Sequence, residues 1–525
     1  MSRTPPHGVP AAHRQDPPSR GCHPASPQVG LAVPPAGSQH NLNDVHGLDL
    51  VIIIAYLVLI TAVGITLSRR IQDARDFFLA GRSLGWGIIG LSIIGTNVSA
   101  QSYVGAAGGA WNYGIAQANF EWIGAIPAMI LASLIFIPVY WRAGVYSIPE
   151  YMGLRYTVGV RVLSALIACV FSVFAIAVSF WAIAVTLEIY LGWPMWLGIL
   201  VTGVVVGLYS ISGGLAAVAF TDALQVVIMF IGGLAILWLG LSEVGGLGNF
   251  ARSLTDEHPN HLQTYLAADH PDFPWVGVLL GLAFVLSPAY WIGNQAILQR
   301  TLGAKSEWDA KASMMFAAFA KTLVPLLIVF PGLLALVMKA QIDYPDAALP
   351  WVVKNVLPPG LSGLMFIAII AALQSSLDSG LNSTSLLITR DIRGVLQPNR
   401  DVSRDLAVGR AWTLAILVVG MATAPLIGDL GGIFFFIQVL LSLFQGPTMA
   451  LLLCGVLTRW ATPAAGMITL IAGLTLSGFL TLIGMNMLYV AFLSFVFSLA
   501  VVLSVSRHTP RLPDAILDRL VFRRD

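Results

Sequence analysis

Runs of about twenty apolar residues recur along most of this 525-residue chain, and they limit the folds that it can adopt. The hydrocarbon core of a bilayer takes about 20 residues of helix to cross. Only 10% of the residues are charged and 57% are hydrophobic, far from the composition of a soluble domain. The pattern therefore predicts an all-α polytopic membrane protein with about thirteen transmembrane helices, near residues 48–68, 84–111, 117–140, 161–190, 194–211, 216–241, 274–299, 310–339, 361–390, 404–427, 431–457, 460–484 and 486–506.

The distribution of Lys and Arg predicts how these helices are oriented. Basic residues gather in alternate connections between the spans, whereas connections such as 242–273 and 340–360 carry mainly Asp, Glu and His. Since cytoplasmic connections are enriched in Lys and Arg, we expect a multi-pass protein of the plasma (inner) membrane with its N-terminus outside and its C-terminus in the cytoplasm. The basic set is Arg69, Arg70, Arg75, Arg82, Arg142, Arg155, Arg161, Arg300, Lys305, Lys311, Arg390, Arg393, Arg400, Arg404, Arg459, Arg507, Arg511, Arg519, Arg523 and Arg524.

The start of the chain differs from the rest in composition. Residues 1–46 are rich in Pro, Ser, Ala and Gly and lack hydrophobic periodicity, which predicts a disordered extracytoplasmic tail. The three cysteines, Cys22, Cys169 and Cys454, lack the spacing of a metal site or a disulfide framework. The net charge of +2 reflects the basic connections, so the expected contacts are membrane lipid and a small molecule, and no nucleic acid.

Two of the predicted helices contain residues that interrupt a membrane helix. Residues 93–102 place Gly, Asn, Gln and hydroxyl residues in mid-membrane, and residues 285–294 contain Pro288, which removes a backbone hydrogen bond. Each interruption begins a block of five predicted spans, 84–241 and 274–457. Five is odd, so the second block enters the membrane from the opposite side, as in transporters built from inverted repeats. The alternative is two ordinary kinks, because Gly and Pro are frequent in membrane helices.

A polar stripe crosses the otherwise apolar helix predicted at 361–390. Water is absent at this depth, so the stripe must face the protein interior or a water-filled cavity. Closely spaced oxygen atoms without Cys or His suit a hard cation such as Na+, and the alternative is hydroxyl groups that pack helices together. At 3.6 residues per turn, the residues on one face are Ala372, Ser375, Ser376 and Ser379, with Asp378 and Asn382 at its edge.

Ionisable residues inside the predicted spans indicate further sites. Glu121, Asp222, Lys321 and Asp378 all fall within spans, where a single unpaired charge is costly. Glu121 and Lys321 can neutralise each other while offering a carboxylate and an ammonium group to a polyhydroxylated ligand. The alternative is a plain ion pair that holds two helices together.

Four segments together resemble one family of membrane transporters. They are residues 143–151, 213–225, 294–300 and 374–384. In combination they closely resemble the sodium/solute symporter family, and the sodium/sugar (glucose/galactose) branch is the nearest likeness. The resemblance implies a LeuT-type fold. Its parts would be a leading helix and cytoplasmic loop at 47–83, a first inverted repeat at 84–241, an external loop at 242–273, a second repeat at 274–457, and two C-terminal helices with a cytoplasmic tail at 458–525.

The resemblance also implies which residues bind substrate and ions. The sugar-contacting positions are matched by Asn97, Glu121, Ser287, Lys321 and Gln438, and the aromatic inner gate by Tyr290. The shared sodium site is matched by the backbone carbonyls of Gly95, Val98 and Ala372 and the hydroxyls of Ser375 and Ser376. Some members hold a second sodium between an acidic residue matching Asp222 and hydroxyl groups on the helix predicted at 361–390. With the carboxyl group of Asp378 beside them, that site would here use Asp222, Ser375, Asp378 and Ser379.

Two positions depart from the sugar branch. Ser102 stands where its members carry a longer polar side chain, and Asp378 stands where close relatives have a small or hydroxylated residue. The first departure leaves the sugar open. The second adds a carboxyl group that either helps to bind a second cation or is protonated in its buried surroundings.

The sequence therefore predicts a secondary active transporter, a sodium-coupled sugar symporter that works by alternating access. The alternative is a sodium symporter of the same family for an amino acid, carboxylate or vitamin. A channel fits the paired interruptions less well. Only about twenty residues follow Ser506, so no soluble catalytic domain is expected there and the protein should not be an enzyme.

Overall fold

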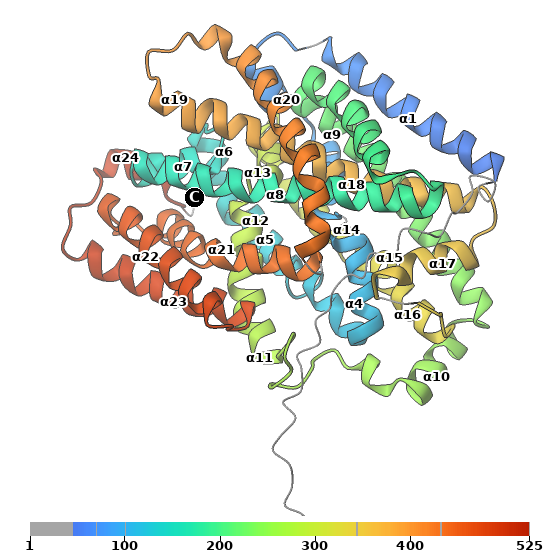
Figure 1. Ribbon diagram of the computed structural model, residues 1–525. Coiled ribbons are helices and arrows are strands. Elements are labelled where there is room, and N and C mark those ends of the chain that lie inside the picture. The colour runs from blue at the N-terminus through green and yellow to red at the C-terminus, as the bar shows by residue number, and fades with distance from the viewer. Residues whose placement is uncertain (1–45, 70, 100, 343–344, 431–432, 524–525) are drawn as a thin grey trace, which may run out of the picture.

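The computed structural model describes residues 46–69, 71–99, 101–342, 345–430 and 433–523, which form a bundle of helices (Figure 1). The predicted tail at 1–46 lies almost entirely outside the described residues. The first helices are α1 (Gly47–Ser68), α2 (Ala74–Leu79), α3 (Trp86–Asn97), α4 (Ala106–Tyr113), α5 (Ile126–Leu131), α6 (Ile137–Ala143), α7 (Ile148–Arg155), α8 (Val158–Leu191), α9 (Met195–Glu243) and α10 (Leu247–Glu257). The remaining ones are α11 (Trp275–Gly277), α12 (Ser287–Gly293), α13 (Gln295–Leu302), α14 (Glu307–Lys321), α15 (Val324–Ile328), α16 (Phe330–Val337), α17 (Ala348–Val356), α18 (Leu361–Leu386), α19 (Arg393–Leu396), α20 (Asp405–Thr423), α21 (Ile433–Leu457), α22 (Pro463–Leu482), α23 (Met487–Ser506) and α24 (Asp514–Leu520).

Ten helical segments of the described chain are long and apolar enough to cross a membrane, or eleven if a bent pair counts as one span. The predicted thirteen are thus not confirmed, for two physical reasons. The 49-residue α9 counts once among the ten, although Gly214 at φ 51° and ψ −152° interrupts it between the two spans predicted at 194–211 and 216–241. The predicted second span is divided, because α3 alone has only 12 residues.

The interruption predicted at 93–102 is confirmed. Helix α3 ends at Asn97, and Val98 leaves the helical region at φ −79° and ψ 80°. A π-helical segment, Gln101–Gly105, follows before α4 begins. The last carbonyl groups of α3 are therefore not used by a further helical turn and are available to other partners.

The interruption predicted at Pro288 is wrong. The backbone stays helical from Trp275 to Gly293 because a π-helix, Val278–Leu286, precedes the proline. In this register the Ser287 N–H reaches back five residues to the Leu282 carbonyl, and Pro288, which has no N–H, follows directly as the second residue of α12. The chain leaves the helix at Asn294, six residues later, with ψ 116°.

Helix α18 lies at the centre of the bundle. It packs against α9, α8, α1 and α3, and 78% of its most apolar stretch is buried within the protein. Helix α1 lies at the periphery with 22% buried, and α21, α22 and α23 form a group on another side (Figure 1). The polar stripe of α18 therefore faces protein, as its composition requires in a membrane.

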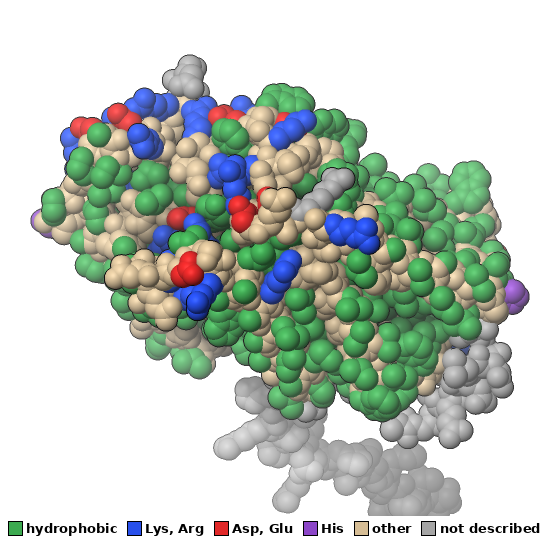
Figure 2. Space-filling view, turned by 90° about the horizontal axis from the view of Figure 1, so that it is seen from above, with side chains coloured by type: hydrophobic (Ala, Val, Ile, Leu, Met, Phe, Trp, Pro, Cys, Tyr) green, Lys and Arg blue, Asp and Glu red, His purple; other side chains and the backbone are tan. Residues whose placement is uncertain are grey.

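The arginine-rich connections meet at one end of the bundle, which we call the basic end. There Arg142 pairs with Glu307 at 2.8 Å, and Arg161 pairs with Asp391 at 2.7 Å. The buried Arg155 donates hydrogen bonds to the carbonyls of Gly455, Thr458 and Ala461. Figure 2 shows Lys and Arg side chains gathered over one part of a surface that elsewhere is largely hydrophobic. This grouping agrees with the predicted asymmetry of the connections, whereas the side of the membrane on which each end lies stays a prediction.

Candidate functional site

A cavity of about 200 Å³ lies inside the bundle between α3, α8, α12, α14, α18 and α21. Its walls include every side chain that the sequence assigned to substrate or to the gate: Asn97, Glu121, Ser287, Tyr290, Lys321 and Gln438. These residues come from segments up to 341 positions apart in the chain (438 − 97). The structure thus brings the whole predicted substrate set together at one place.

Glu121, Lys321 and Asn97 form the polar wall of this cavity. The Lys321 ammonium pairs with the Glu121 carboxylate and donates a hydrogen bond to Asn97 Oδ1. Asn97 Nδ2 in turn donates to the Tyr290 hydroxyl at 3.4 Å. Lys321 is 1% exposed, so Glu121 and Asn97 replace the water that its ammonium group would otherwise bind.

The ends of two helices position this polar wall. Asn97 is the last residue of α3, and Lys321 is the last residue of α14, where the chain bends by 48° before α15. The indole N–H of Trp122, next to Glu121, donates to the Thr322 carbonyl at that bend. Polar side chains therefore reach the cavity from points where the helices stop, as in other membrane proteins with interrupted helices.

The wall offers hydrogen bonds without net charge. The carboxylate of Glu121 accepts and the ammonium of Lys321 donates, and their charges cancel. Ser287 and Gln438, each 8% exposed, add a hydroxyl and an amide from the facing helices. Such a set suits a small neutral molecule with several hydroxyl groups better than a charged one, because a charged ligand would break the balance of the ion pair.

The predicted first sodium site lies where the end of α3 meets α18. Ser376 Oγ donates to the Thr96 carbonyl at 3.2 Å and to the Ala372 carbonyl at 3.4 Å. A Cβ atom added to Gly95 would lie 3.1 Å from Ser375 Oγ, so these two residues are neighbours. Carbonyl groups at the end of α3 and hydroxyl groups of α18 are the kind of oxygen ligands that Na+ takes at interrupted helices.

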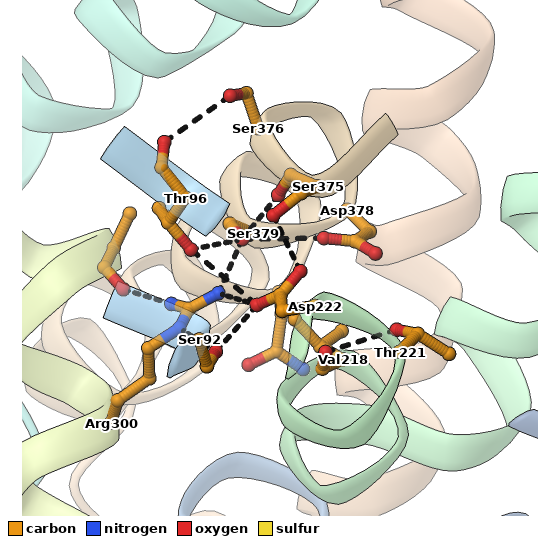
Figure 3. Close-up of polar contacts among 12 residues, drawn as sticks. Ser92, Thr96, Val218, Thr221, Asp222, Arg300, Ser375, Ser376, Asp378 and Ser379 are labelled. Carbon is orange, nitrogen blue, oxygen red and sulfur yellow. Dashed lines mark hydrogen bonds and ion pairs between the residues drawn. The ribbon is translucent and has the colours of Figure 1, made fainter. Parts of the chain in front are cut away.

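The residues of the predicted second sodium site also lie together, but a buried arginine shares the place (Figure 3). The Arg300 guanidinium pairs with Asp222 Oδ2 at 2.8 Å and donates to Ser379 Oγ. Its Nε donates to Ser92 Oγ at 2.5 Å, and Ser92 donates to the same Asp222 oxygen at 2.5 Å. The other oxygen, Oδ1, accepts from Ser375 Oγ at 2.5 Å.

Arg300 lies in this group of residues and not in a basic connection, where the distribution of Lys and Arg predicted it. The structure buries it in α13 with 1% exposure. Two signals could have found it: Asp222 needed a partner inside its span, and Arg300 closes the segment 294–300 that carries the family resemblance.

Asp378 completes this group of charges. Its Oδ2 accepts a hydrogen bond from the Tyr209 hydroxyl at 2.7 Å, and its Oδ1 accepts from Ser379 Oγ at 3.2 Å. Asp222 and Asp378 are both fully buried. One guanidinium therefore faces two carboxyl groups, and Asp378 has only neutral hydrogen-bond donors among the described residues.

Comparison with known proteins defines the family. Residues 77–473 match the model of the sodium:solute symporter family. The chain is 33% identical over 474 residues to the sodium/glucose cotransporter of Vibrio parahaemolyticus, covering 84% of this chain and 87% of that protein. It is 30% identical over 537 residues to sodium/glucose cotransporter 1 of Sus scrofa, covering 90% and 81%. Sodium/glucose cotransporter 4 of Homo sapiens is 32% identical over 469 residues, covering 82% and 68%.

Solved structures share the fold. A substrate-bound, outward-open Na+-coupled sialic acid symporter matches with a TM-score of 0.81 and 19% identity, over 89% of this chain and 99% of that one. Mhp1, a nucleobase-cation-symport-1 family transporter in a closed conformation, matches with a TM-score of 0.55 and 14% identity, over 86% and 100%.

The fold and its buried polar site thus define a secondary transporter of the LeuT type, as the sequence predicted, and not an enzyme. The chain belongs to the sodium:solute symporter family, and sodium is the coupling ion that this family implies.

Proposed function

We propose that the protein is a sodium-coupled sugar symporter that works by alternating access. The observation that carries this proposal is the cavity wall in which Glu121 and Lys321 pair beside Asn97 and Gln438. This wall supplies donors and acceptors to a polyhydroxylated ligand without net charge. The sodium/glucose cotransporters to which the chain is similar support the same substrate class.

We assign roles to the residues as follows. The sugar is held by Asn97, Glu121, Ser287, Lys321 and Gln438, and Tyr290 acts as the gate beside it. Sodium is held by the carbonyls of Gly95, Val98 and Ala372 and by the hydroxyls of Ser375 and Ser376. The Ser376 hydroxyl donates to the Thr96 carbonyl at the end of α3 and to the Ala372 carbonyl of α18. These contacts bring oxygen atoms of both helices together and support the assignment.

A second sodium near Asp222, Ser375, Asp378 and Ser379 belongs to the proposal. The support is the charge balance, since one guanidinium faces two carboxyl groups. Arg300 already binds Asp222 and Ser379. The second sodium ion would therefore bind beside Asp378, away from Arg300, or Asp222 would leave Arg300 to bind the ion.

We also propose the orientation in a plasma (inner) membrane. The basic end would face the cytoplasm, which places the N-terminus outside and the C-terminus inside. The inverted repeats at 84–241 and 274–457, with a leading helix, an external loop and two C-terminal helices, complete the proposed organisation. The proposed orientation can be tested with variants that carry a single cysteine in one connection at either end of the bundle. A membrane-impermeant reagent should label only the cysteines on the outside.

Uptake into proteoliposomes tests the substrate and the coupling ion together. Purified protein is reconstituted and supplied with radiolabelled sugars, amino acids, carboxylates and vitamins, with and without an inward Na+ gradient. We expect Na+-dependent uptake of a neutral sugar. Uptake of a non-sugar solute alone would instead establish the alternative, a symporter of the same family with another substrate.

Two truncations test whether the polar wall binds the sugar. A hydrogen bond to a charged partner contributes about 1.5–3 kcal/mol, so Lys321→Ala should weaken sugar affinity roughly ten- to a hundredfold. Gln438→Ala should weaken it in the same direction. Ser442→Ala is the matched control on α21, because among the described residues its hydroxyl bonds to the Val439 carbonyl of its own helix and it does not line the cavity. If neither variant changes the affinity for sugar, Lys321 and Gln438 have only a structural role, and the proposal that this wall binds a sugar is wrong.

A further inference from the structure

The cavity is longer than the substrate site that the family resemblance indicated. Three of its helices each contribute two polar residues that are seven positions apart: Ser179 and Ser172 on α8, Ser287 and Asn294 at α12, and Gln438 and Gln445 on α21. Seven residues advance about 10 Å along a helix and return to nearly the same face. The cavity therefore has two levels of polar groups, and the second lies nearer the basic end.

The second level consists of Ser172, Asn294 and Gln445. The rings of Phe171 and Phe444, the neighbours of two of these residues, meet edge to face at 5.5 Å, which brings α8 and α21 together there. A Cβ atom added to Gly293 would lie 3.1 Å from Leu452 and 3.6 Å from Thr448, so the end of α12 packs against the turns of α21 that follow Gln445, and Asn294 and Gln445 line the same cavity.

Gln445 has an unused acceptor in this second level. Its side chain is 3% exposed, and its Oε1 has no hydrogen-bond partner among the residues that the structure describes. A buried polar atom without a partner is costly, so an oxygen that lines a cavity is expected to meet a ligand or water there. Asn294 uses its Oδ1 to cap α13 at Ile297 N, which leaves its amide NH2 group as a donor.

Tyr290 lies on α12 between the residues that this helix contributes to the two levels. It stands three residues after Ser287 and four before Asn294, and its hydroxyl accepts from Asn97 of the first level. A sugar that passes Tyr290 toward the basic end therefore reaches Ser172, Asn294 and Gln445 next.

We propose that Ser172, Asn294 and Gln445 form a second sugar-binding position on the basic-end side of Tyr290. This rests on the proposed function, because it assigns the same substrate class to a further part of the cavity. The second position has hydroxyl and amide groups and no ion pair, so it binds a neutral sugar more weakly than the first. It holds the sugar between the gate and the exit.

Equilibrium binding in a background with a weakened first position tests the proposal. Binding of radiolabelled glucose to purified protein in Na+ is measured for Gln438→Ala, with and without Gln445→Leu. A neutral hydrogen bond is worth a factor of about two to ten, so Gln445→Leu should weaken the remaining binding by that factor. Ser172→Ala in the same background should weaken it similarly and serves as the second variant if Gln445→Leu does not fold. Ser442→Ala is the control and should have no effect.

The outcomes separate this proposal from the proposed function. Wild-type protein that binds glucose, together with residual binding in Gln438→Ala that neither Gln445→Leu nor Ser172→Ala changes, overturns the second position alone. Wild-type protein that neither binds nor transports any sugar overturns both proposals. Thermal unfolding of each variant in detergent shows whether a loss of binding comes from a loss of fold.

Discussion

At the level of single residues, the buried pair of Arg300 and Asp222 is the feature that most alters the chemistry expected for the ion site. The guanidinium binds Asp222, Ser92 and Ser379 at once, so the acidic residue assigned to a second sodium already has a cation. Moving two charges out of water is costly, and the pair recovers that cost only while both partners are present.

Removal of one partner should therefore destabilise the fold. For Arg300→Ala we expect a loss of about 3–5 kcal/mol, because Asp222 is left buried and unpaired. Unfolding of purified protein in detergent, followed by temperature or denaturant, measures it. Arg142→Ala is the control: its pair with Glu307 is 46% and 24% exposed, so about 0–1 kcal/mol is expected. Equal losses in the two variants would contradict the assigned roles.

The hydroxyl groups of α18 carry a second prediction at this scale. Ser376 contacts the carbonyls of Thr96 and Ala372, so Ser376→Ala removes an oxygen from the proposed sodium site. The Na+ concentration for half-maximal uptake should rise about two- to tenfold if one neutral ligand contact is lost. Ser385→Ala is a matched control on the same helix, because that hydroxyl binds the Gly409 carbonyl elsewhere. An unchanged sodium dependence in the Ser375→Ala and Ser376→Ala double variant would exclude this site.

At the level of elements, the interruptions of the helices show what the sequence could and could not predict. The break after Asn97 was predictable, because Gly, Asn and hydroxyl residues cluster there. The break predicted at Pro288 is absent, because the π-helix before it keeps the backbone helical although the proline has no N–H to donate. Nothing in the local composition indicates a π-helix. The bend after Lys321 was not anticipated, although Pro325 lies four residues beyond it.

Gly214 gives a prediction about α9. Its φ of 51° is a conformation that side chains with a Cβ atom rarely adopt, and an added Cβ would lie 2.4 Å from the Phe77 carbonyl. Gly214→Ala should therefore lower the unfolding temperature and the yield of folded protein. Gly478→Ala in α22 is the control, because its added Cβ meets nothing within 4 Å. A Gly214→Ala protein as stable as the Gly478→Ala protein would show that α9 tolerates a straight path at this point.

At the level of the whole molecule, composition and charge were sufficient to predict a helical membrane protein and the grouping of its basic connections. The substrate set was found through family resemblance, and the structure brings its members into one cavity. The partnership of Asp222 with Arg300 could not be derived, because the two residues are 78 positions apart and meet through the packing of α9 and α13 against α3 and α18. Local patterns identify a buried charge but not its partner.

For the complete transport cycle we predict how many sodium ions move with each sugar molecule. One charge moved through 100 mV is worth about 2.3 kcal/mol, which supports roughly fifty-fold accumulation of sugar, and a second ion squares that ratio. We expect two Na+ per sugar, measured as the sugar gradient that nulls net flux at a known voltage and Na+ gradient in proteoliposomes. Asp378→Ala should reduce the number to one. A ratio of one in the wild type that Asp378→Ala leaves unchanged would exclude the second site.

The group of one arginine and two aspartates has an electrical consequence even when no substrate is present. Arg300, Asp222 and Asp378 together carry a net charge of −1 when Asp378 is ionised and none when it is protonated, whereas Glu121 and Lys321 together carry none. When the empty protein changes the side to which its cavity opens, this charge crosses part of the membrane field, at about 2.3 kcal/mol per charge and 100 mV. With Asp378 ionised, a voltage step applied without sugar or sodium should therefore produce a brief displacement current that Asp378→Asn abolishes, whereas a wild-type protein without this current has a protonated Asp378. The resting potential would then help to return the empty carrier to the outside.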